Sequence, residues 1–120
     1  MSELNATIFA YTSFAKFLAD YCEMRRRDKP TFSQRWLTKR AGLKSASLLS
    51  MIILGERRAT LDTALKLAQA MNLNPKEEEY ALLIAELDLD RSQYINNLVA
   101  TRVEELRASS RDESLERSAY

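Results

Sequence analysis

Two short helical segments separated by a glycine restrict this chain more than any other part of its sequence. We predict one helix over about 33–41, beginning at Ser33, because serine is a favoured N-cap. Gly42 follows at the position where a helix end often needs a left-handed residue. A second predicted helix covers about 45–54 and ends before Gly55. Such a pair of helices requires a compact helical body to support it.

The rest of the sequence also favours helices. It has two Gly and two Pro in 120 residues, and Leu, Ala, Arg, Glu and Lys dominate. Apolar residues recur at spacings of three and four, so we predict an all-α fold. We expect a flexible N-terminal arm over 1–10, a helical domain over 11–88, a further C-terminal helix over 89–108 and a disordered tail over 109–120.

Several classes of chemistry are missing from the residue inventory. The chain has no histidine, a single cysteine and two glycines, so it lacks the usual parts of a metal site, a catalytic dyad or a phosphate-binding loop. We therefore expect no catalytic residue, no metal, no cofactor and no enzyme activity. No apolar run reaches the roughly 18 residues of a membrane span. A secretory signal is not evident, and a lone cysteine favours a cytoplasmic protein.

The charges are strongly polarised along a chain whose net charge is only +1. Residues 1–58 have a balance of +6, and residues 59–120 have a balance of −5. The most basic part is 25–58, with ten Lys or Arg against two acidic residues. Such a distribution suits a polyanion at one end of the molecule, although solvated helix surfaces would give the same count.

The two short helices carry the features of a helix-turn-helix motif. Ala41 and Gly42 are small enough for the turn between two helices that pack at a steep angle. Leu37 of the first helix is placed to meet Leu48 of the second. Short polar side chains stand near the helix starts, where backbone N–H groups would face phosphate. This motif places its second helix in the major groove of DNA.

The motif also resembles a known family. Ser33-Gln34, Leu37, Ala41-Gly42-Leu43 and the segment 65–73 resemble the Cro/C1-type helix-turn-helix domain of phage repressors. Residues 11–87 are similar, in addition, to the N-terminal part of a family of bacterial transcriptional regulators. The resemblance implies a five-helix repressor-like bundle with an additional C-terminal helix, and a function in binding double-stranded DNA as a regulator.

By this resemblance the helix over 45–54 would be the recognition helix. Base edges would be met by Ser45, Ala46, Ser47 and Ser50, and phosphates by Arg35, Lys44, Arg57 and Arg58. Together with Ser33 and Gln34 at the start of the first helix, these residues form the predicted DNA-binding set. Bidentate base readout normally uses Arg, Lys, Asn or Gln, and the predicted recognition helix has none of these. We therefore predict mostly phosphate contacts.

Other interpretations remain open at this point. Met51 and Leu54 make the predicted recognition helix apolar on almost every side, which suits a protein partner on a scaffold that does not bind DNA. The C-terminal helix carries a broad stripe that either packs on its own core or forms a homodimer. Four residues of this stripe are predicted to contact the second copy if a homodimer forms, namely Ile95, Leu98, Val99 and Arg102. Trp36 is expected in the core or at its boundary.

Overall fold

The computed structural model describes residues 7–119, and every element in that range is helical. This confirms the predicted all-α fold. The elements are a short 3₁₀ helix and six α-helices, namely η1 (Thr7–Ala10), α2 (Phe14–Asp28), α3 (Gln34–Arg40), α4 (Leu48–Ile53), α5 (Leu61–Ala70), α6 (Pro75–Leu89) and α7 (Gln93–Ala119). None of the helices in the described range is long and apolar enough to span a bilayer.

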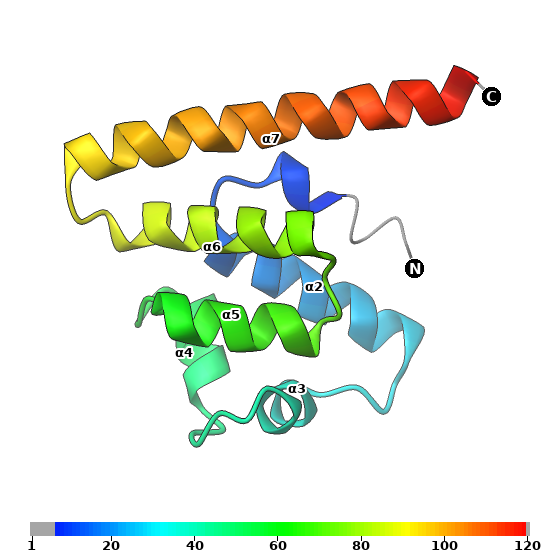
Figure 1. Cartoon of the computed structure of the whole chain (residues 1–120). Coiled ribbons are helices and arrows are strands. Elements are labelled where there is room, and N and C mark those ends of the chain that lie inside the picture. The colour runs from blue at the N-terminus through cyan, green and yellow to red at the C-terminus, as the bar shows by residue number, and fades with distance from the viewer. Residues whose placement is uncertain (1–6, 120) are drawn as a thin grey trace.

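The helices α3 and α4 lie at one end of the molecule and α7 lies at the other (Figure 1). Between them, α6 packs against α5 on one side and α7 on the other, and it also contacts α2 and η1. The α4 helix contacts α2, and α3 contacts both α4 and α5. The five helices α2–α6 thus form a bundle, and α7 is the additional C-terminal helix.

The residues Ser33, Thr60 and Asn74, each of a type that favours a helix start in the sequence, cap α3, α5 and α6. The Ser33 hydroxyl accepts a hydrogen bond from the N–H of Trp36 at 3.0 Å, and the Thr60 hydroxyl caps α5 in the same way. At α6, Asn74 Oδ1 accepts from the Glu77 N–H at 2.8 Å while Glu77 Oε1 accepts from the Asn74 N–H at 2.9 Å. This reciprocal capping box satisfies two N–H groups that the helix cannot pair internally.

One continuous apolar core joins the two short helices to the rest of the bundle. Leu37 of α3 and Leu49 and Ile52 of α4 are almost fully buried. Their partners in the core come from every other helix of the bundle and include Phe14, Phe17, Leu18, Ala64, Leu67, Tyr80 and Ile84. The position and tilt of α3 and α4 are therefore set by close packing rather than by the turn alone.

The N-terminal segment corrects one expectation. A flexible arm was predicted over 1–10, but residues 7–10 form η1 and the side chain of Ile8 is completely buried. The hydroxyl of Tyr80 reaches the backbone carbonyls of Phe9 and Tyr11, which ties η1 to α6. The sequence did not show this because the burial of Ile8 depends on helices that follow much later. Residues 1–6 lie outside the described range.

The C-terminal segment corrects two more. The predicted disordered tail over 109–120 is helical as far as Ala119, because α7 continues without a break from Gln93. A helix already anchored on the core gains one hydrogen bond for each added residue, and Arg, Glu, Leu and Ala support this extension. The segment Asp90-Arg91-Ser92-Gln93 has the pattern of a capping box, which predicts Asp90 as the cap of this helix. Asp90 instead ends α6 in a left-handed conformation, with φ of +50°.

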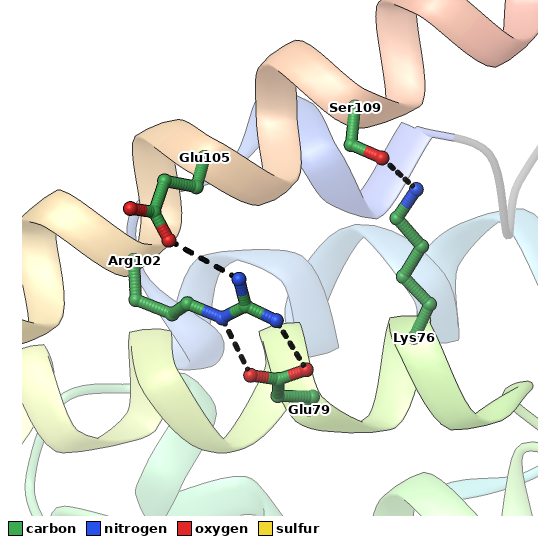
Figure 2. A network of polar contacts seen from close by, with 5 residues as sticks. All are labelled: Lys76, Glu79, Arg102, Glu105 and Ser109. Carbon is green, nitrogen blue, oxygen red and sulfur yellow. Dashed lines mark hydrogen bonds and ion pairs between the residues drawn. The ribbon is translucent and has the colours of Figure 1, made fainter.

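The α7 helix packs on its own core through part of its length. Val103 and Leu106 are buried, and Val99 is half-buried against the core. Arg102 and Ser109 bond across the same contact to Glu79 and Lys76 of α6 (Figure 2). The first turns of α7 differ, because Ile95 and Leu98 are exposed together with Tyr94. The predicted stripe is thus divided between core packing and open surface.

Candidate nucleic-acid interface

The turn between α3 and α4 starts with a left-handed glycine. Gly42 has φ of +75°, and its N–H bonds to the carbonyl of Lys39 at 3.0 Å. The N–H of Leu43 bonds to the carbonyl of Thr38 at 3.1 Å. These two bonds form a Schellman motif, which satisfies the last carbonyls of α3 and turns the chain sharply toward α4. Gly55 ends α4 in the same way, with φ of +80°.

The helix α4, which was predicted as the recognition helix, is shorter than expected. It covers Leu48–Ile53 rather than about 45–54, so Ser45 and Ala46 belong to the turn and Ser47 takes the N-cap position. The hydroxyls of Ser45 and Ser47 lie 3.0 Å apart and bond to each other, and Ser47 makes no side-chain cap. Since these hydroxyls serve the turn, the helix begins only where the apolar residues start.

Most of the predicted DNA-binding side chains lie on the surface. Ser50 and Gln34 are half-buried, whereas the other eight are exposed, namely Ser33, Arg35, Lys44, Ser45, Ala46, Ser47, Arg57 and Arg58. All of them come from α3, α4 or the turns beside these two helices. The structure therefore brings the predicted residues onto neighbouring segments at one end of the bundle.

The packing of α4 explains why most of its residues are apolar. Leu49 and Ile52 face the core, while Met51 is half-buried and Leu54 is 67% exposed. Ser47, Ser50 and Leu54 follow helical spacing and so share the outward side of the helix. This outward side is neutral, with an aliphatic group at its C-terminal end.

Unpaired cations lie on α3 and on the turns at both ends of α4. Arg35, Lys44 and Arg57 form neither an ion pair nor a side-chain hydrogen bond among the side chains that the structure describes, which end at Arg111. The same is true of Lys39, one helical turn after Arg35 on α3, which the sequence reasoning did not select. Cations with no carboxylate partner keep their full attraction for phosphate, so their lack of partners favours an anionic ligand over internal ion pairing.

Arg58 differs from the neighbouring Arg57. Its Nη1 donates to the carbonyl of Leu89, the last residue of α6, at 3.3 Å. A guanidinium at a helix C-terminus complements the unpaired carbonyls and the negative end of the helix dipole. Arg58 therefore has a structural contact that the sequence did not reveal, since its partner lies 31 residues further along the chain.

A second feature that the sequence reasoning missed lies on α3. The guanidinium carbon of Arg40 sits 5.6 Å from the centroid of the Trp36 ring, in a cation–π arrangement. Trp36 is 46% exposed, so it stands at the boundary of the core with nearly half of its surface open. The sequence contained a signal for this contact, because an aromatic residue and an arginine four positions apart on a helix lie on the same side.

Comparison with known proteins supports the assignment of this part of the chain. A family model described as helix-turn-helix matches residues 24–77, which span the end of α2 through the start of α6. No curated protein and no solved structure gave a match. The matched family is one of DNA-binding domains rather than of enzymes. The match over residues 24–77 agrees with the predicted Cro/C1-type helix-turn-helix domain.

Proposed function

We propose that this protein is a transcriptional regulator that binds double-stranded DNA through the α3–α4 surface, in the compartment that holds the DNA. The observation that carries the proposal is the set of exposed, unpaired cations on α3 and on the turns at either end of α4, namely Arg35, Lys39, Lys44 and Arg57. In a helix-turn-helix domain this side of the second helix enters the major groove, and flanking cations then meet the phosphate backbone.

Phosphate contacts supply most of the affinity in this proposal. The outward side of α4 offers serine hydroxyls and no Arg, Lys, Asn or Gln, so it lacks the bidentate pairs that discriminate strongly between bases. Sequence preference would come from single hydroxyl contacts, from Leu54 against a thymine methyl group, and from the shape of the DNA.

The test is fluorescence anisotropy of the full chain on labelled duplexes over a range of salt concentrations. The logarithm of affinity should fall with the logarithm of salt, with a slope of about −0.9 for each phosphate neutralised. Lys44→Ala should weaken binding on every duplex and reduce the slope by about one phosphate. Arg111→Ala is the matched control, because it removes the same charge from α7 at the opposite end of the molecule. Absence of binding at low salt contradicts the proposal.

A second candidate function is a protein-interaction module built on the same scaffold. It is motivated by Leu54, which is 67% exposed at the C-cap of α4 and follows the half-buried Met51. Here Leu54→Ser would abolish partner binding, whereas the DNA proposal gives this variant a small effect. This second function would be favoured if the unsubstituted protein binds no duplex and if Leu54→Ser no longer binds a protein partner that the unsubstituted protein binds.

We also propose that the regulator acts as a homodimer through the first turns of α7. Repressor-like domains commonly bind two half-sites as dimers, and Tyr94, Ile95 and Leu98 offer an exposed apolar patch for a second copy. Deleting the whole helix would be a poor test, since Val103 and Leu106 belong to the core. Leu98→Glu should instead shift the protein to a monomer in sedimentation analysis. The control is Ala100→Glu, a nearby exposed position on a different side of α7.

A further inference from the structure

Arg40 is held in a fixed orientation by two contacts. Its guanidinium lies over the Trp36 ring at 5.6 Å, and its Nε donates to the carbonyl of Ala70, at the end of α5, at 3.0 Å. Neither Nη1 nor Nη2 has a hydrogen-bond partner within the described residues. The two terminal nitrogens therefore form a rigid donor pair at the surface, which suits a planar, two-oxygen acceptor.

This donor pair stands beside an open groove between α3 and α5. The groove is lined by Arg40 and Ala41 from α3 and its C-cap, and by Lys66, Gln69 and Ala70 from α5. No carboxylate lines it. Lys66 pairs with Asp62 at 3.1 Å, and Asp62 is itself strongly exposed. The groove thus combines two cationic side chains, an amide and two small side chains.

Aromatic rings connect Trp36 to α2 through Phe32, which lies in the turn between α2 and α3. Phe32 lies 5.7 Å from Trp36 and 6.3 Å from Tyr21, measured between ring centroids. Burial raises the pKa of the Tyr21 hydroxyl, while the charges of Arg25 and Arg40 lower it, so both guanidinium groups act on this one hydroxyl. The Nε of Arg25 is buried and has no hydrogen-bond partner. A second cation therefore reinforces the field near Arg40.

The site faces a different direction from the DNA-binding surface. Trp36 and Arg40 are four residues apart on α3 and share one side, as do Arg35 and Lys39. At 3.6 residues per turn these two sides are separated by about 100° around the helix axis. DNA held by Arg35 and Lys39 would therefore leave Trp36 and Arg40 accessible.

We propose that the Trp36–Arg40 site binds an acidic segment of a partner protein. A carboxylate of that segment would accept two hydrogen bonds from the free nitrogens of Arg40, and an adjacent apolar side chain would cover the exposed part of Trp36. Charge complementarity supports a carboxylate, and the exposed indole supports a peptide over a DNA backbone. Arg40 already occupies a face of the ring, so an aliphatic side chain against the indole edge fits better than a stacked base.

The test uses the full chain and a synthetic peptide in which Asp and Leu alternate, with an Asn–Leu peptide as its uncharged counterpart. Trp36 is the only tryptophan, so its fluorescence reports directly on this site. We expect a saturable change with the acidic peptide and at least a tenfold weaker response, roughly the value of a charge-assisted pair, with the neutral one. No saturable response to the acidic peptide overturns the proposal.

Three variants separate the site from its surroundings, with the label placed on the peptide. Arg40→Ala should weaken peptide binding about tenfold, and Arg40→Lys, which keeps the charge but loses the fork, should recover only part of it. Trp36→Leu keeps an apolar side chain but removes the ring over which Arg40 lies, so it tests whether that ring is needed for peptide binding. Lys39→Ala is the matched control and should leave peptide binding unchanged. Thermal unfolding shows whether each variant is folded.

DNA binding by the same variants distinguishes this proposal from the proposed function. Lys39→Ala should weaken DNA affinity, whereas Arg40→Ala should not. Equal losses of DNA affinity in both variants would assign Arg40 to the DNA surface and overturn the peptide proposal. Unaltered peptide binding in Arg40→Ala would overturn it as well. If the unsubstituted protein binds the peptide but binds no DNA, only the proposed function is contradicted.

Discussion

Arg102 of α7 holds the carboxylate of Glu79 on α6 through two hydrogen bonds, from Nε at 2.8 Å and from Nη2 at 3.2 Å (Figure 2). Its third contact is a bond from Nη1 to Glu105 at 3.1 Å. Both partners of the pair are partly exposed. The hydrogen bond from Arg102 lowers the pKa of the Glu79 carboxyl below its usual 4.5. This contact links α7 to the bundle at the surface, above the buried Val103 and Leu106.

The first prediction concerns the pH dependence of this link. A carboxyl whose pKa is lower in the folded state stabilises the fold above its unfolded value of 4.5, and this contribution is lost as the pH falls through the lowered pKa. Arg102→Met should therefore reduce the free energy of unfolding slightly near neutral pH and have no effect in strong acid. Urea unfolding of both proteins over a pH series measures the difference. A difference independent of pH would show that Arg102 acts through packing alone.

The second prediction concerns the turn between the two short helices. Gly42 has φ of +75°, and a Cβ built on it meets no atom within 4 Å. Gly42→Ala should thus lower stability by about 1–2 kcal/mol through backbone strain alone. Gly42→Asn should cost less, since asparagine tolerates the left-handed region. Chemical denaturation compares the two variants, and equal losses would contradict the backbone explanation.

The third prediction concerns the anchoring of the N-terminal segment. The Tyr80 hydroxyl reaches the carbonyls of Phe9 and Tyr11 in a fully buried setting. Tyr80→Phe should lower stability by about 1 kcal/mol, because it leaves two part-buried carbonyl acceptors without their donor. Tyr94→Phe removes the same hydroxyl from a side chain that is 72% exposed and should change stability by less than about 0.5 kcal/mol. Equal effects would mean that η1 is not held by Tyr80.

The fourth prediction separates two adjacent arginines. Arg57 has no partner in the described residues, so Arg57→Ala should weaken DNA binding on all sequences and leave the unfolding free energy unchanged. Arg58 donates to the carbonyl of Leu89, so Arg58→Ala should also reduce stability, by about 0.3–1 kcal/mol. Anisotropy and urea unfolding measured on both variants test this. Equal changes of the unfolding free energy in the two variants would show that the contact of Arg58 with Leu89 does not stabilise the fold.

Local patterns in the sequence predicted much of this protein correctly. The all-α fold follows from periodicity, and the caps at Ser33 and Asn74 follow from short-range preferences. The left-handed glycine after α3 follows from the same kind of rule. Each of these depends on residues within about one helical turn, where backbone geometry limits the alternatives. The helix-turn-helix assignment succeeded because its signals are of this local kind.

Tertiary structure decided what depends on distant partners. Ile8 is buried by helices later in the chain, so no local pattern could distinguish η1 from a loose arm. Arg58 meets Leu89, and Arg40 meets Ala70, across separations of about thirty residues. The same holds for α7, whose stripe is buried at Val103 and open at Leu98 because α6 covers only part of it. The sequence by itself determined which helices form, and their packing decided which side chains remain available for binding.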